Sequence, residues 1–226
     1  MTKTATIAEA HAEITATLAR EAEAAGRMSP PELVAVSKVQ PDDRIDAALD
    51  AGLRVFGENR VQEAQGRWGE RFADHRADLT LHLIGPLQTN KAADAVALFD
   101  VIQTLDREKL ARALLKAADK VGRLPELMVQ VNIGREDQKS GVLPEDTPAF
   151  LDRLRSEYDI APIGLMCIPP VGEPSAPHFW AMEQLAARCE VTGLSMGMSS
   201  DYATAVPFGA THVRVGSALF GARSYV

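Results

Sequence analysis

The chain has 226 residues, of which 46% are hydrophobic and 24% charged, and its formal net charge is −7. This composition indicates a folded protein with a sizeable core and excludes a disordered chain. The acidic balance argues against nucleic-acid and anionic-membrane partners, because such surfaces need an excess of Lys and Arg.

The chain carries no recognisable targeting or membrane signal. Its first residues lack the basic start and apolar run of a secretory leader, and no stretch approaches the roughly 20 apolar residues that span a bilayer. Cys167 and Cys189 lack metal-ligand spacing, so we expect two reduced, buried thiols and no metal site. These features favour a cytoplasmic protein without a membrane partner.

The first expected element is an amphipathic helix in a segment rich in Ala and Glu. Apolar or half-apolar side chains recur there at helical spacing, at Ile7, His11, Ile14 and Leu18. We expect the helix to end near Gly26. Residues 1–27 should then pack on the remainder of the protein.

After this helix, short apolar runs alternate with segments of helical character. The eight expected strands are 33–37, 53–56, 79–84, 99–102, 127–131, 160–166, 193–196 and 212–215. Eight strands that alternate with helices predict an α/β fold, a (β/α)8 TIM barrel. Because no linker rich in Pro, Gly or Ser divides the chain, residues 1–226 are expected to form a single domain. An open doubly wound sheet is the rival, but it usually has a Gly-rich loop where Lys38 stands.

Lys38 follows the first expected strand and precedes a polar turn. A lysine held there by a rigid element faces the open rim of a barrel. If it is partly desolvated and close to other cationic groups, its amine loses a proton readily enough to form an imine with an aldehyde or ketone. The alternative is a solvated charge at the end of a strand.

In a barrel, the residues that follow each strand gather at one end, where the chemistry of this fold takes place. The loops after strands seven and eight commonly hold a phosphate with backbone N–H groups at the start of a short helix. Ser199 and Ser217 supply hydroxyls in these two loops, and Gly197 and Gly216 allow a close backbone approach. The alternative is that these glycines and serines only build turns.

Several motifs together resemble the pyridoxal 5′-phosphate homeostasis proteins, small barrels related to the N-terminal barrel of alanine racemase. In chain order the motifs are AVSK (35–38), FGEN (56–59), HLIGPLQTNK (82–91), VNI (131–133), KSG (139–141), GLM (164–166), SMGMS (195–199) and RVGSALFG (214–221). They span most of the chain in the order of the family. The resemblance implies that the protein binds the cofactor pyridoxal 5′-phosphate (PLP).

The resemblance also assigns roles to individual residues. Lys38 matches the lysine that forms a Schiff base with the aldehyde of PLP. Ser199, Gly216 and Ser217 match the phosphate-binding residues, and Arg214 matches the arginine that faces the pyridine nitrogen.

Three further positions match the family around the barrel mouth. Asn59 and His82 correspond to polar positions there, and Met166 corresponds to one that lines the cofactor. One departure is visible, because Arg60 stands where the family often has an aromatic residue. This departure puts a ring contact from that loop in doubt, but not the Schiff base.

Racemisation requires a base on each face of the substrate carbon, and in alanine racemases the second base is a tyrosine from another domain. Tyr158, expected in a loop, Tyr202, expected in a helix, and Tyr225 at the C-terminus have no evident reason to lie opposite Lys38. An arginine facing the pyridine nitrogen would also keep that nitrogen unprotonated and weaken carbanion stabilisation. We therefore expect no catalytic residue and a protein that binds PLP without turnover.

Three functions remain open at this point. The first is a PLP carrier that acts in cofactor homeostasis and amino-acid and keto-acid balance. The second is a PLP-dependent amino-acid racemase, and the third is a barrel enzyme for another phosphate compound. The expected partners are PLP, free amino acids and PLP-dependent apoenzymes, with the protein itself a monomer or weak dimer. Lys91 and Lys139, in polar loops, are candidates for a transient role in cofactor uptake or release.

Overall fold

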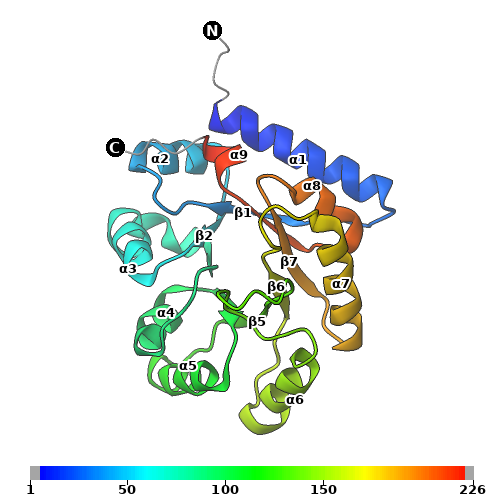
Figure 1. The fold of residues 1–226 in the computed structure, drawn as a ribbon. Helices are drawn as coiled ribbons and strands as arrows, with labels where there is room; N and C mark the ends of the chain where they lie inside the picture. Colours follow the sequence, from blue (N-terminus) through cyan, green and yellow to red (C-terminus); the bar gives the residue numbers. More distant parts are fainter. Residues whose placement is uncertain (1–5, 222–226) are drawn as a thin grey trace.

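The computed structural model describes residues 6–221. Eight strands form a closed barrel in which each strand pairs with the next along the chain and β8 pairs with β1 (Figure 1). All of these pairings are parallel. The strands are β1 (Glu32–Val36), β2 (Val55–Glu58), β3 (Thr80–Leu83), β4 (Val101–Leu105), β5 (Glu126–Val131), β6 (Gly164–Cys167), β7 (Gly193–Met198) and β8 (His212–Val215). The predicted TIM-barrel architecture is confirmed.

Helices surround the barrel, and the loops that join them to the strands lie at its two ends (Figure 1). The α-helices are α1 (Ile7–Ala24), α2 (Asp42–Asp50), α3 (Val61–Ala64), α4 (Ala92–Leu98), α5 (Glu108–Val121), α6 (Thr147–Tyr158), α7 (Ser175–Arg188), α8 (Tyr202–Ala205) and α9 (Ser217–Phe220). A π-helix, η1 (Gln65–Arg71), continues α3, and short 3-10 turns are η2 (Ala73–Asp78), η3 (Thr89–Lys91) and η4 (Val206–Phe208). None of the helices within residues 6–221 combines the length and apolar character that a bilayer span needs.

The apolar runs form strands because side chains on both faces of a parallel barrel are buried, either inside it or beneath the helices. Every residue of β4 is buried, for example. β6 and β7 approach each other so closely that a Cβ on Gly164 would lie 2.2 Å from the carbonyl oxygen of Gly193. Glycine is therefore required at Gly164 by the neighbouring backbone.

The sixth expected strand is shorter than its apolar run. The run 160–166 predicts a strand throughout, but β6 begins only at Gly164. Pro162 lacks the N–H that a strand ladder requires, so residues 160–163 connect α6 to the barrel instead. Tyr158, expected in a loop, is the last residue of α6, and the left-handed Asp159 ends that helix.

The N-terminal helix α1 packs against α2, α8 and α9 on one side of the barrel (Figure 1). A capping box between Thr6 and Glu9 begins the helix. Its buried face is formed by Ala10, Ile14, Leu18 and Ala22. After the helix, Arg27 donates hydrogen bonds to the carbonyl oxygens of Val206 (2.9 Å) and Ala210 (2.6 Å), which attaches the segment to η4 and to the loop that precedes β8. Of the predicted range 1–27, residues 1–5 lie outside the described part.

Candidate functional site

A cavity of about 540 Å³ opens at the carboxyl ends of the strands. Its lining comes from the residues that end or follow β1, β2, β3, β6, β7 and β8. They are Val36, Lys38, Asn59, Ile84, Ile168, Met198, Ser199, Ser200, Arg214, Gly216, Ser217 and Ala218. Six of the predicted site residues therefore meet in one cavity, namely Lys38, Asn59, Ser199, Arg214, Gly216 and Ser217.

Lys38 lies two residues beyond the end of β1, in a tight turn whose Gln40 N–H donates to the carbonyl oxygen of Ser37 at 3.1 Å. The side chain of Lys38 is half-buried and reaches the cavity. The next residue, Val39, has a φ of 58°, in the left-handed region. A β-branched residue rarely adopts this conformation, because its side chain crowds the backbone there.

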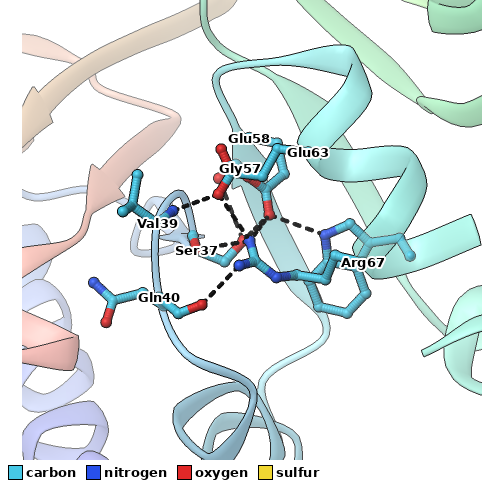
Figure 2. A network of polar contacts seen from close by, with 8 residues as sticks. Ser37, Val39, Gln40, Gly57, Glu58, Glu63 and Arg67 are labelled. Atoms are coloured by element: carbon cyan, nitrogen blue, oxygen red, sulfur yellow. Dashed lines mark hydrogen bonds and ion pairs between the residues drawn. The ribbon is translucent and has the colours of Figure 1, made fainter. Parts of the chain in front are cut away.

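Side chains from β2 and the helix that follows it hold this turn (Figure 2). Arg67 donates to the carbonyl oxygens of Ser37 (2.8 Å) and Gln40 (2.7 Å), on either side of Lys38. Glu63 accepts a 2.5 Å hydrogen bond from the Val39 N–H. Three backbone groups around Lys38 are thus fixed by two side chains that do not themselves line the cavity.

A buried carboxylate, Glu58, anchors this arrangement (Figure 2). Its Oε1 accepts hydrogen bonds from Arg67 (2.6 Å), the Ser37 hydroxyl (2.7 Å) and the Trp68 indole (3.1 Å). Burial raises the pKa of Glu58, and the neighbouring Arg67 guanidinium opposes that rise. All three partners donate to Oε1, so these contacts favour the ionised form of Glu58 paired with Arg67 and oppose the effect of burial.

The loops after β7 and β8 meet at Ser199. Its hydroxyl oxygen accepts hydrogen bonds from the N–H groups of Gly216 (3.1 Å) and Ala218 (3.3 Å). In β7, Gly197 has a φ of +91°, and a Cβ there would lie 2.8 Å from that of Ala205. The predicted need for glycine in these loops is therefore met at Gly197 by backbone conformation and by close packing.

Arg214 lies at the floor of the cavity and is almost fully buried, at 4% exposure. Its guanidinium donates to the Ser195 hydroxyl (2.6 Å) and to the carbonyl oxygen of Cys167 (2.8 Å). The Ser195 hydroxyl in turn donates to Gln103 Oε1 at 2.6 Å, and Gln103 Nε2 lies 2.7 Å from His82 Nδ1. A polar chain therefore runs from the cavity into the barrel interior.

The direction of every hydrogen bond in this chain follows from Arg214. A guanidinium only donates, so the Ser195 hydroxyl accepts from Arg214 and passes its own proton to Gln103. The amide nitrogen of Gln103 then donates to His82, which requires an unprotonated Nδ1 and a proton on Nε2. Burial, together with nearby His212, lowers the pKa of His82 to about 3, consistent with a neutral ring.

Two predicted site residues lie away from the cavity lining. His82 is buried within the barrel, where its ring centroid lies 5.7 Å from that of His212, and it reaches the site only through Gln103 and Ser195. Met166 is fully buried in β6, beside Ser195 of β7. The expected position of His82 at the barrel mouth is therefore corrected. His82 is the third of the four residues of β3, and its side chain is buried in the barrel interior and does not line the cavity.

The loop residues named from the sequence fall beside the main cavity. Arg60 is exposed and lines a neighbouring cavity together with Lys91, and Lys91 forms an ion pair with Asp94 at 3.6 Å. Lys139 forms a 2.5 Å ion pair with Glu136 and lines a third cavity, which shares Asn59 with the main one. No cluster of His, Cys, Asp and Glu suited to a metal ion occurs within residues 6–221.

Sequence reasoning missed the residues that support the site from behind. Ser195 is a polar residue within the apolar run 193–196, and Gln103 directly follows the run 99–102; a polar residue that is buried with such a run needs a hydrogen-bond partner inside the barrel. That signal was available in the sequence. No such signal exists in the sequence for Arg67 and Glu63, because charged residues on a helical segment usually face solvent.

Comparisons with known proteins identify the family of this chain. The family described as the alanine racemase N-terminal domain matches residues 12–224. A pyridoxal phosphate homeostasis protein of Pseudomonas aeruginosa is 42% identical over 230 residues, which cover 97% of each chain. The structure of PipY from Synechococcus elongatus with PLP bound has 39% identity and a TM-score of 0.82, over 95% of this chain and 100% of that chain.

A more distant similarity concerns the fold alone. Alanine racemase of Clostridium difficile has a TM-score of 0.68 at 12% identity, over 93% of this chain and 57% of that chain. On these similarities, the chain belongs to the pyridoxal phosphate homeostasis protein family, whose barrel is the alanine racemase N-terminal domain.

Proposed function

We propose that the protein binds PLP as a Schiff base on Lys38 and acts in intracellular PLP homeostasis, and so in amino-acid and keto-acid balance, without catalytic turnover. One observation carries the proposal. Lys38, Arg214 and the Ser199 and Gly216 loops, which come from opposite ends of the chain, line the same cavity.

The residues of the cavity fit the chemical groups of PLP. The hydroxyls of Ser199 and Ser217 and the N–H groups of Gly216 and Ala218 would bind the phosphate. The two N–H groups already point toward one oxygen, the hydroxyl of Ser199. Backbone N–H groups and hydroxyls are the donors that bind phosphate without a metal. The cavity, at about 540 Å³, falls within the usual range for small-molecule sites.

Lys38 is the amine proposed to attach the aldehyde. Lys38 would hold the cofactor through an imine, for which its neutral amine would supply the nitrogen and the two protons that leave with the aldehyde oxygen as water. When bound, PLP supplies a conjugated ring that can draw electrons from the carbon next to the bound nitrogen. Asn59 and Ile84 line the same cavity as Lys38 and would orient the ring.

Arg214 limits the chemistry that such a site performs. The Arg214 guanidinium offers only donors and stays charged, so a ring nitrogen that faces it remains an unprotonated acceptor. Withdrawal of electrons into the ring is then weak. The bonds from Arg214 to Ser195 and to the Cys167 carbonyl keep the guanidinium in place, which supports this reading of the site.

A second base opposite Lys38 has no candidate among the described tyrosines. The Tyr158 hydroxyl donates to Glu108 at 3.1 Å at the end of α6, and Tyr202 begins α8; neither lines the cavity. The third, Tyr225, lies outside the described residues. These positions favour binding and supply of the cofactor over racemisation, which is the alternative function.

The proposed partners follow from this role. PLP and free amino acids would meet at the cavity, and PLP-dependent apoenzymes in the cytoplasm would receive the cofactor. The open position of the cavity at the strand ends suits exchange of a small ligand. The protein itself would act as a monomer or weak dimer.

The test is borohydride reduction of the protein incubated with PLP, followed by peptide mass mapping. The expected result is a yellow protein with one reduced pyridoxyl adduct, on Lys38, and no adduct in Lys38→Ala. Lys116→Ala, at an exposed lysine of α5, is the matched control and should label fully. An adduct on another residue, or none at all, would overturn the proposal, and uptake of a different phosphate compound would then favour another barrel enzyme.

The racemase alternative is tested with the same preparation. The holoprotein is incubated with L-alanine, and D-alanine is measured against free PLP at the same concentration. If the proposal is right, the holoprotein should form D-alanine no faster than free PLP does. D-alanine formed well above the rate of free PLP and lost in Lys38→Ala would establish the alternative.

A further inference from the structure

We propose that Glu63 and Arg67 are positioning residues for Lys38, which hold the 37–40 turn in a conformation that it would not keep unaided. This proposal rests on the proposed function, since it concerns how the amine of Lys38 is presented to PLP. Neither residue lines the cavity, so both would act through the backbone of the turn (Figure 2).

The conformation of Val39 is the first observation. Val39 is 70% exposed, so no packing in the core explains its side chain. Its φ of 58° lies in a region that glycine enters freely and that β-branched residues enter rarely. A residue stays in such a conformation only where its surroundings hold it, and conformations of this kind cluster at functional sites.

The contacts that hold the turn are the second observation. The Glu63 carboxylate accepts the Val39 N–H at 2.5 Å, and Arg67 donates to the carbonyl oxygens of Ser37 and Gln40 at 2.8 and 2.7 Å. The charged side chains therefore fix one donor and two acceptors of a four-residue segment. Lys38 lies in the middle of that segment, so its Cα cannot shift while these bonds remain.

Glu63 and Arg67, which we call the clamp, are themselves held by a buried carboxylate. Arg67 pairs with the buried Glu58 at 2.6 Å and with Glu63 at 3.5 Å, so a single guanidinium links both carboxylates. Arg67 lies in η1, a π-helix of seven residues. Such π-helical turns are frequent at functional sites. From this segment Arg67 reaches the carbonyl oxygens of Ser37 and Gln40.

The experiment compares Glu63→Ala with Glu63→Gln, which keeps an oxygen to accept the Val39 N–H. Three quantities are measured: the rate and equilibrium constant of Schiff-base formation with PLP, the hydrogen exchange of the Val39 amide in the PLP-free protein, and the thermal unfolding midpoint. Glu145→Ala is the control, because it removes a 2.9 Å ion pair with Arg135 far from Lys38.

For Glu63→Ala we expect PLP retention to weaken about tenfold, the ratio that corresponds to loss of one charge-assisted hydrogen bond. The Val39 amide should exchange faster, while the unfolding midpoint should move no more than in Glu145→Ala. Glu63→Gln should stay within about threefold of the wild type. A purely structural role would instead move the midpoint and leave the Schiff base of the folded protein unchanged.

The double variant Glu63→Ala/Val39→Gly gives the sharpest readout. Glycine takes a positive φ without strain, so it should restore most of the PLP retention that Glu63→Ala loses. Arg67→Lys is a second, independent variant. It keeps a positive charge beside Glu58 but cannot reach both carbonyl oxygens, and it should weaken retention about threefold or more.

The outcomes separate this proposal from the proposed function. If the wild type forms no adduct on Lys38, the proposed function is wrong and the clamp has no role in it. If the wild type forms the adduct, but Glu63→Ala and Arg67→Lys both bind PLP within about twofold of it, the clamp proposal alone is overturned. Failure of Val39→Gly to restore Glu63→Ala would overturn it as well.

Discussion

Arg214 donates a 2.6 Å hydrogen bond to the hydroxyl of Ser195, inside the barrel. This contact joins the cavity to the polar chain that continues through Gln103 to His82. It also sets the direction of that chain, because a guanidinium has no acceptor. The position of Arg214 at the cavity floor therefore depends on residues that PLP would never touch.

Removing the Ser195 hydroxyl should disturb both ends of this contact. Ser195→Ala leaves Arg214 Nη1 and Gln103 Oε1 without a partner, while Arg214 Nη2 keeps its bond to the Cys167 carbonyl oxygen, and an unpaired buried polar group costs about 1–3 kcal/mol. We expect the free energy of unfolding of the PLP-free protein, measured in urea, to fall by this amount, and PLP retention to weaken because one of the two bonds that hold Arg214 is lost.

The control for Ser195 is Ser156→Ala. The Ser156 hydroxyl donates to the carbonyl oxygen of Asp152 at 2.7 Å on the exposed side of α6, so its removal should change stability little. Equal effects of the two substitutions would contradict the importance of the interior chain.

The protein should lose stability in mild acid because of His82. Burial lowers its pKa in the folded protein from 6.5 to about 3, and that of His212 to about 4. Between these values and 6.5 the unfolded chain binds more protons than the folded one, so stability falls as the pH falls. His82 alone should lower the free energy of unfolding by about 2 kcal/mol at pH 5 relative to neutral pH.

Urea unfolding measured from pH 7.5 to pH 5 checks this expectation. His82→Asn keeps an acceptor near the position of Nδ1 and does not titrate, so its stability should fall less steeply with pH than that of the wild type. His75→Asn, at an exposed histidine, is the control for the substitution itself. A slope for His82→Asn as steep as that of the wild type would refute the assignment.

Gly85 should not tolerate a side chain. A Cβ at this position would lie 2.2 Å from the carbonyl oxygen of Asn59, a cavity residue, and the Gly85 carbonyl is held by the Thr104 hydroxyl at 2.9 Å. Gly85→Ala should therefore displace Asn59 and destabilise the protein by about 3 kcal/mol. Thermal unfolding and PLP retention measure the two effects.

Gly66→Ala is the matched control for that substitution. Gly66 is exposed in η1, and a Cβ there would meet nothing within 4 Å. Alanine at Gly66 should be neutral or stabilise the protein by about 0.4–1 kcal/mol through the lower entropy of the unfolded chain. Similar losses at Gly85 and Gly66 would show that the close approach to Asn59 is unimportant.

Neither cysteine should react in the folded protein. Burial raises the pKa of the Cys167 thiol to about 12 and also raises that of Cys189, so the reactive thiolate is scarce near neutral pH. Intact mass after treatment with iodoacetamide at pH 8 should show no addition to the native protein and two additions in urea. Rapid labelling of native Cys167 would mean that the barrel interior opens readily.

The order of the apolar runs was enough to predict the barrel, because eight buried parallel strands that alternate with helices can form few other folds. The residues at the ends of those runs, Lys38 and Ser199 among them, were equally visible in the sequence. Parallel strands place their carboxyl ends on one face, so Lys38 and Ser199 had to meet there once the barrel closed. Six of the predicted site residues do line one cavity: Lys38, Asn59, Ser199, Arg214, Gly216 and Ser217.

The tertiary structure decided what lies behind that cavity. Strands buried on both faces show no polar and apolar alternation, so the sequence did not determine how deep within the barrel His82 and Gln103 lie or that they contact each other. The chain from Arg214 through Ser195 to His82 exists only because barrel closure brings β8, β7, β4 and β3 around one axis. The hydrogen bond from Arg67 to the Ser37 carbonyl oxygen depends in the same way on the pairing of β1 with β2. Long-range packing determines that pairing, and the local periodicity of the sequence does not.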